Sequence, residues 1–145
     1  MTKEDKKLLL ADLCARFPYG VKIKRINCPI NLSVTGILGG YVHHTPFYVG
    51  GNIEINTSII EEVKPYLRPM SSMTEEEFLE YHNIKYNKVT YRDNWKRIDI
   101  GKFQNVGIIP IEEYLDWLNE HHFDYRGLIE KGFALEAPEG MYEIK

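Results

Sequence analysis

The sequence predicts an α+β fold in a single domain over residues 1–145, in which helices frame a small bent antiparallel β-module at residues 19–70. Apolar residues near the start of the chain and after Pro110 recur at helical spacing, which is typical of amphipathic helices. Residues 20–60 instead alternate apolar and polar side chains between glycine-rich turns, as short strands do. The length of 145 residues matches one ordinary domain, and 43% hydrophobic with 27% charged residues is typical of a globular protein.

The N-terminal helix is predicted to begin after Thr2 and to stop at Pro18. Thr2 and Asp5 have the spacing of a capping box, in which each side chain accepts a hydrogen bond from the backbone N–H of the other residue. The expected apolar stripe consists of Leu8, Leu9, Ala11, Leu13, Ala15 and Phe17.

Within the β-module, residues 30–55 are predicted to form four or five short strands, after an earlier strand that begins at Val21. Val21 and Ile23 alternate with basic residues, and the glycine pairs at 39–40 and 50–51 permit tight turns between strand-forming segments. Because glycines within short strands allow small barrels to bend, this pattern favours an SH3-like half-barrel over an open sheet. The prolines of residues 59–70 exclude a long helix there and favour a final strand or a short helical turn.

The second half of the chain, residues 71–145, is predicted to hold a middle helix, a hairpin, a C-terminal helix and a cap. Thr74 and Glu77 form a second capping box, for a helix that runs to about residue 81 or 82. Residues 84–103 alternate like a hairpin, and Pro110 precedes the third helix, whose apolar positions recur at helical spacing. In the acidic tail we expect a short helix or turn at 126–131 and then coil, capping the β-module.

Charge and composition argue against several classes of protein. A net charge of −3 offers no overall attraction for nucleic acid or anionic lipid. Prolines and glycines interrupt the uncharged interval 26–53, so it cannot be a membrane-spanning helix, and no secretory signal is readable. We therefore expect a cytoplasmic protein without membrane contact, in which both cysteines are reduced and Cys14 is buried in the first helix.

No catalytic residues, metal ligands or cofactor are predicted. His43 and His44 would point to opposite faces of a strand, so they cannot hold one ion together and are expected at the surface or in a turn. His121 and His122 diverge by about 100° on a helix, which separates them in the same way. The glycines of residues 36–40 indicate tight turns, because they lack the pattern of a phosphate-binding loop.

The predicted hairpin is the best candidate for a functional surface, because its basic and aromatic residues are interleaved. Charges that follow phosphates and rings that stack on bases are what a nucleotide or a single-stranded nucleic acid requires. The alternative is that the rings are core or cross-strand partners. The candidate binding residues are Lys85, Tyr86, Lys88, Tyr91, Arg92, Trp95, Lys96 and Arg97.

Two segments carry a resemblance, residues 64–77 (KPYLRPMSSMTEEE) and residues 117–142 (WLNEHHFDYRGLIEKGFALEAPEGMY). They resemble small proteins of phages, prophages and mobile elements of gut anaerobic bacteria. The resemblance covers roughly half of the chain and implies a lineage without implying an activity.

Because the sequence of a folded domain shows no catalytic constellation, we expect a non-enzymatic interaction protein that binds another protein. The resemblance adds the expectation that it inhibits a host defence. The alternative is a module for nucleotides or single-stranded nucleic acid, which a sheltered cavity lined by tyrosine, phenylalanine and basic residues would favour. Self-association is also open, because an uncovered sheet edge at residues 53–55 would invite pairing between copies and so form a homo-oligomer.

Overall fold

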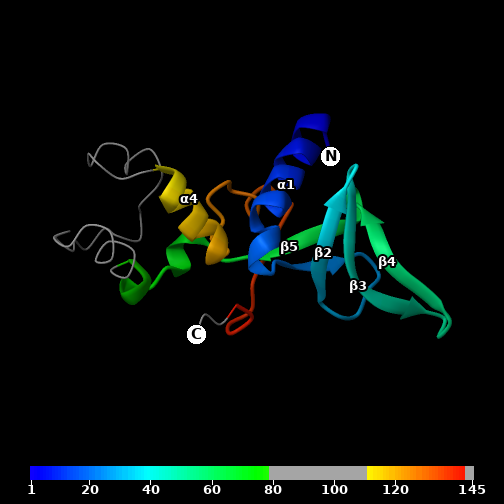
Figure 1. The fold of residues 1–145 in the computed structure, drawn as a ribbon. Coiled ribbons are helices and arrows are strands. Elements are labelled where there is room, and N and C mark those ends of the chain that lie inside the picture. The colour runs from blue at the N-terminus through cyan, green and yellow to red at the C-terminus, as the bar shows by residue number, and fades with distance from the viewer. Residues whose placement is uncertain (79–110, 143–145) are drawn as a thin grey trace.

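The computed structural model describes residues 1–78 and 111–142, which form an α+β arrangement around a mostly antiparallel, open sheet (Figure 1). The helical elements are α1 (Lys3–Arg16), α4 (Ile111–Glu120), and the 3-10 turns η1 (Phe17–Tyr19), η2 (Ile60–Glu62) and η3 (Met70–Ser72). The strands are β1 (Lys22–Arg25), β2 (Leu32–Leu38), β3 (Tyr41–Val49), β4 (Ile53–Ile59), β5 (Val63–Leu67) and β6 (Leu135–Glu136).

Helix α1 begins with the predicted capping box. The Asp5 amide donates to Thr2 Oγ1 over 3.1 Å, and the Thr2 amide donates to the Asp5 carboxylate over 2.9 Å. Leu9, Asp12, Leu13 and Arg16 form its fully buried face. The prediction that Cys14 is buried is wrong: Cys14 is exposed, because it follows Leu13 and so lies about 100° around the helix from that face.

The sheet has the strand order β4-β3-β2-β1-β5-β6, and every pair is antiparallel except β5 with β6. Gly39 and Gly40 have φ values of +59° and +83°, which a two-residue turn of type I′ between β2 and β3 requires. After η2, strand β5 pairs with β1. The SH3-like half-barrel is not confirmed, because the order of the described strands ends openly at β4 and β6.

Strand β6 lies where the sequence predicts coil. Leu135 and Glu136 pair in parallel with Tyr66 and Leu67 of β5, and the amide of Ala137 donates to the carbonyl of Leu67 over 2.8 Å. Two residues are too few for alternation to be visible in a sequence, so only the tertiary contact reveals this strand. The C-terminal segment therefore completes the sheet as well as covering it.

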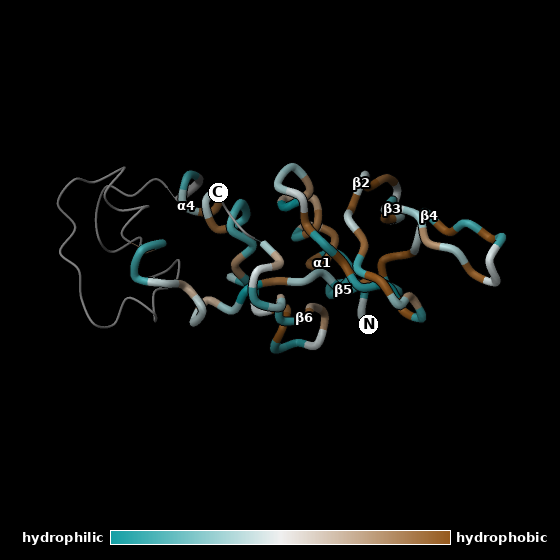
Figure 2. Tube along the Cα trace, turned by 90° about the horizontal axis from the view of Figure 1, so that it is seen from below, coloured by the Kyte–Doolittle hydropathy of each residue, from teal (hydrophilic) through white to brown (hydrophobic). Residues whose placement is uncertain are grey.

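The hydrophobic core lies between α1, the sheet and the C-terminal segment. It joins leucines of α1 to β1 and β2, and it includes Leu128 and Ala134 from the tail. Figures 1 and 2 place α4 at one end of the described chain and the sheet formed by β2, β3 and β4 at the other. We call these three strands the β2–β4 ribbon.

The described residues include part of the predicted middle helix and the predicted C-terminal helix. Helical residues begin at Glu75, and the predicted capping box is present, with the Glu77 amide donating to Thr74 Oγ1 over 3.2 Å and the Thr74 amide to the Glu77 carboxylate over 3.1 Å. The rest of that helix and the hairpin at 84–103 lie outside the described residues. Helix α4 occupies the segment after Pro110 for which a helix is predicted.

Candidate functional site

The binding residues predicted from sequence, Lys85, Tyr86, Lys88, Tyr91, Arg92, Trp95, Lys96 and Arg97, all lie outside the described residues. The described chain offers five other places where chemistry or binding can be assessed. They are a buried ionic network, a stacked His–Tyr pair, a Ser–His pair between β3 and β4, a groove beside the C-terminal segment, and the surface of the ribbon itself.

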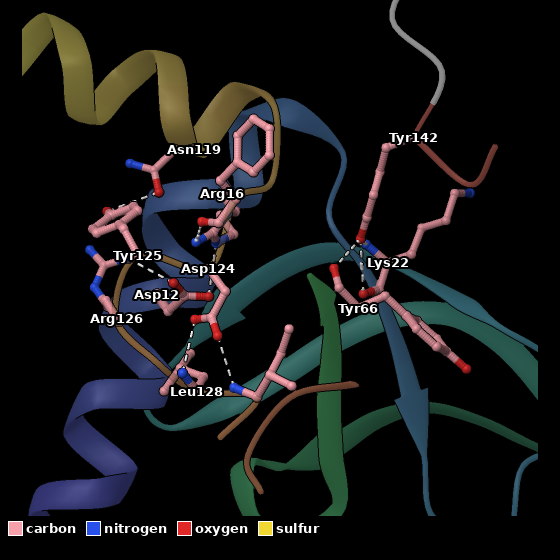
Figure 3. Close-up of polar contacts among 12 residues, drawn as sticks. Asp12, Arg16, Lys22, Tyr66, Asn119, Asp124, Tyr125, Arg126, Leu128 and Tyr142 are labelled. Carbon is pink, nitrogen blue, oxygen red and sulfur yellow. Dashed lines mark hydrogen bonds and ion pairs between the residues drawn. The ribbon is translucent and has the colours of Figure 1, made fainter. Parts of the chain in front are cut away.

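The buried ionic network joins α1 to the C-terminal segment (Figure 3). The fully buried Asp12 carboxylate accepts hydrogen bonds from Arg16 Nε over 2.9 Å and from Arg126 Nη1 over 2.7 Å. Arg16, which is also fully buried, donates in addition to the carbonyl of Phe123. Because these charges are paired with one another, they hold the two segments together and are not presented to a ligand.

Asp124 and Tyr125 order the turn after α4. The Asp124 carboxylate accepts from the amides of Leu128 and Ile129 over 2.8 and 2.9 Å. Tyr125 Oη donates to Asn119 Oδ1 over 3.0 Å. Each of these bonds satisfies a polar group within the turn and α4, so we interpret the set as structural.

His122 and Tyr142 form a stacked pair beside β1. The rings of His122 and Tyr142 lie 3.8 Å apart between centroids. His122 Nε2 donates to the carbonyl of Tyr19 over 3.0 Å, while Tyr142 Oη accepts from the Lys22 amide and donates to the Tyr66 carbonyl, each over 2.8 Å. The pair therefore links the C-terminal segment to η1, β1 and β5.

Burial makes both of these side chains poor acid–base catalysts. It lowers the pKa of His122 to about 4, with a further contribution from the Arg16 charge, and the hydrogen bond to Tyr19 offsets only part of this. Burial likewise raises the pKa of Tyr142 above its usual value. Since a general base works best with a pKa near the working pH, a histidine that stays neutral down to pH 4 is unsuited to that role at pH 7.

Ser58 and His44 have the hydrogen-bonding geometry of a serine nucleophile and its base. A carbonyl can only accept, so His44 Nδ1 donates to Thr45 over 2.8 Å, and His44 Nε2 accepts from Ser58 Oγ over 2.9 Å. However, His44 and Ser58 are 2% and 3% exposed, and Arg25 Nε donates to Ser58 Oγ over 3.1 Å. We therefore interpret the pair as a buried strut between β1, β3 and β4.

This strut corrects the expectation that His43 and His44 lie at the surface or in a turn. Both are on β3, and His44 is buried because the ribbon packs it against Ser58 of the neighbouring strand. His43 is half-buried and bonds Thr57 over 3.2 Å, so the two histidines contact adjacent residues of β4. Their side chains diverge, as a strand requires.

Replacing Ser58 with alanine tests the structural interpretation of the pair. The Ser58→Ala change leaves His44 Nε2 and Arg25 Nε without this partner, and we expect the free energy of unfolding to fall by about 1–3 kcal/mol in urea titrations. Thr35→Ala, at an exposed position of β2, is the control and should change it by no more than about 0.5 kcal/mol. A Ser58→Ala protein as stable as the control would contradict the strut.

A groove of about 560 Å³ lies between η3 and the C-terminal segment. Its lining contains the carboxylates of Glu77, Glu136 and Glu139. The guanidinium of Arg68, which also lines the groove, is paired with Glu77 through two hydrogen bonds of 2.6 Å. Burial raises the pKa of Glu77, but the hydrogen bonds from Arg68 and Thr74 outweigh this effect and hold the pKa below its usual value. Among the described residues, this lining does not have the basic character that would favour a nucleotide.

The β2–β4 ribbon presents an apolar row at its surface. The strand register places Leu38 opposite Tyr41, and Tyr41 opposite Ile59, so the three side chains lie on one face across three strands. They are 74%, 52% and 40% exposed. Exposed Val49 and Ile53 form a second apolar pair near the β3–β4 turn. We call Leu38, Tyr41 and Ile59 the apolar row.

Strand β4 beside this row is the outer strand of the ribbon, and among the described residues no strand pairs with its other edge. Natural edge strands are commonly protected by lysine, proline or inward charges. Strand β4 has no lysine, arginine or proline, and Glu54 is the only Asp, Glu, Lys or Arg between Arg25 and Glu61. The ribbon therefore combines an apolar face with an unprotected edge.

The comparisons with known proteins leave the geometry as the sole basis for assigning a site, since no protein-family model, curated protein or solved structure matches the chain. Within residues 1–78 and 111–142, His, Cys, Asp and Glu form no group of three or more that could hold a metal ion. None of the helices described is both long and apolar enough to cross a lipid bilayer.

Proposed function

We propose that the protein is a non-enzymatic interaction module that binds another protein through the β2–β4 ribbon. The observation that carries this proposal is the apolar row, which lies exposed beside the unprotected edge of β4. Single exposed apolar residues are ordinary, whereas apolar side chains gathered across adjacent strands are typical of protein-binding surfaces. The partner surface that fits this row is apolar and uncharged at its centre.

We infer that the first five strands follow an SH3-like half-barrel path, which would present the ribbon on a bent support. Two observations favour this path. Strand β5 follows the 3-10 turn η2 and pairs with β1, and the strand registers shift between Val34 and Gly36 and between His43 and Phe47. Such irregularities bend a strand and increase its twist.

The internal use of polar groups also favours binding over catalysis in the described chain. The Asp12 network and the Ser58–His44 pair are buried, and their hydrogen bonds hold the elements of the fold together. Nucleotide or nucleic-acid binding by the 84–97 hairpin stays a prediction, because its residues lie outside the described chain. Inhibition of a host defence likewise stays a prediction from the resemblance.

A capture experiment tests the proposed surface. Tagged wild-type protein is incubated with lysate of its native host, and bound proteins and small molecules are identified by mass spectrometry. Leu38→Ser combined with Tyr41→Ser removes two exposed side chains of the apolar row, and we expect recovery of the partner to fall by at least about tenfold, the effect of one or two interface anchors.

The matched control is Phe17→Ser combined with Tyr19→Ser, since these exposed aromatic residues of η1 lie outside the ribbon. The control should retain the partner. Equal recovery by both double variants would contradict the proposed surface. Co-purification of oligonucleotides or nucleotides in place of a protein would support the alternative function.

A further inference from the structure

We propose that one partner of the β2–β4 ribbon is a second copy of this chain, joined by antiparallel pairing of the two β4 strands around a two-fold axis at Asn56. This inference rests on the proposed function in using the same ribbon, and it names the partner. An edge strand offers a row of backbone N–H and C=O groups to any strand that can align with it. Two identical edges related by a two-fold axis form a closed, isologous contact.

The sequence of β4, Ile53-Glu54-Ile55-Asn56-Thr57-Ser58-Ile59, is complementary to itself in this register. Centring the axis on Asn56 places Ile53 opposite Ile59 of the second copy, Glu54 opposite Ser58, and Ile55 opposite Thr57. All seven residues then take part, and any other centre shortens the ladder.

The side chains support this register. Ile53 and Ile59 are 63% and 40% exposed, and pairing would place them side by side at each end of the ladder, where each covers part of the apolar surface of the other. Glu54 would lie opposite Ser58, which carries no charge, and not opposite a second carboxylate, so the register avoids the like-charge contact that destabilises paired strands. At the axis, the exposed Asn56 would meet its own copy without a charge.

Pairing of the edges also extends the apolar row. Directly opposed residues share a face, so Ile59 of one copy would continue the row into Ile53 of the other, and from there into Val49, which is opposite Ile53 in β3. Two symmetry-related rows would then cross a continuous sheet built from both ribbons. The dimer would offer another protein a wider apolar surface than one copy does.

Charge exchange at Asn56 tests both the pairing and its register. We expect wild-type protein to shift from 17.0 kDa toward twice that mass as its concentration rises, measured by light scattering and sedimentation equilibrium. Asn56→Lys alone and Asn56→Glu alone should each stay at 17.0 kDa, since like charges would meet at the axis. An equimolar mixture of the two variants should recover the doubled mass.

Thr35→Lys is the matched control, because it adds the same charge at an exposed position of β2, away from the edge. It should associate like the wild type. Circular dichroism of each variant separates loss of association from loss of folding. Wild-type protein that remains at 17.0 kDa up to its solubility limit overturns the inference, as does a dimer that neither Asn56 variant weakens.

The same variants separate this inference from the proposed function. If Asn56→Lys is monomeric and still captures the lysate partner, the apolar row binds other proteins without requiring the dimer. If the wild type is monomeric but the Leu38 and Tyr41 double variant loses the partner, self-pairing alone is overturned. If the wild type forms the dimer, but the Leu38 and Tyr41 double variant and the Phe17 and Tyr19 double variant recover the lysate partner equally, the proposed binding surface is contradicted and the inference of a dimer is retained.

Discussion

Replacing Asp12 with alanine is expected to lower the free energy of unfolding by about 3–5 kcal/mol, the range for breaking a buried ion pair by removing one partner. Asp12 accepts hydrogen bonds from Arg16 and Arg126 and is fully buried, as is Arg16. Without the carboxylate, the Arg16 guanidinium would remain buried with the Phe123 carbonyl as its acceptor. An uncompensated charge in a low-dielectric interior is costly, which is why the expected loss is large.

Urea titration measures this loss as a lower midpoint with an unchanged slope. Asp12→Asn keeps the size of the side chain while removing its charge, and we expect most of the loss to persist. Glu4→Ala, an exposed change in the first turn of the same helix, should cost no more than about 0.5 kcal/mol. An Asp12→Ala protein within that range of the wild type would show that the network does not stabilise the fold.

Acidification is expected to destabilise the protein through His122. The pKa of this side chain is about 4 in the fold, whereas its ordinary value is 6.5. At a pH between these two values, the histidine takes up a proton when the protein unfolds. The contribution of His122 is therefore fully present above pH 6.5 and is lost as pH falls toward 4. At about 1.4 kcal/mol for each unit of pKa, the loss approaches about 3 kcal/mol.

The physical cause is the surroundings of the second ring nitrogen. Nε2 donates to Tyr19, and Nδ1 is buried without a hydrogen-bond partner among the described residues. Protonation would place a new N–H and a positive charge there, close to Arg16. The fold therefore excludes the charged imidazolium more strongly than the unfolded chain does.

Comparison with His122→Asn isolates this contribution from that of other titrating groups. Asparagine tolerates the left-handed backbone at this position, where φ is +61°, and it does not titrate. Urea titrations from pH 7 to pH 4 should show a shallower loss of stability for the variant than for the wild type. Parallel pH profiles for the two proteins would contradict the assignment to His122.

The sequence predicts those elements whose determinants are local. The two capping boxes, at Thr2 and at Thr74, depend on residues three positions apart, and both are present. The pairing of β5 with β1 and the parallel contact of β6 depend on residues far apart in the chain, so periodicity does not reveal them. The sequence predicts the open edge at β4 only as one alternative, because the order of strands in a sheet depends on tertiary contacts.

Part of the candidate surface can be predicted from the sequence. A two-residue turn at Gly39 and Gly40 places Leu38 opposite Tyr41, and this pairing follows from the turn alone. The position of Ile59 beside Tyr41 cannot be predicted from the sequence, because the register between β3 and β4 shifts between His43 and Phe47. Exposure of Cys14 and burial of His44 likewise depend on which face meets the core.

The ionic network at Arg16 also has a consequence for how the chain acquires its structure. Arg16 contacts a residue 107 positions away, Asp12 one 114 positions away, and Lys22 one 120 positions away. Contacts so distant in sequence slow folding, because a long loop must close before they form. During synthesis, α1 and β1 can therefore form these contacts only after residues 123–142 have left the ribosome, and until then their polar groups lack these native partners.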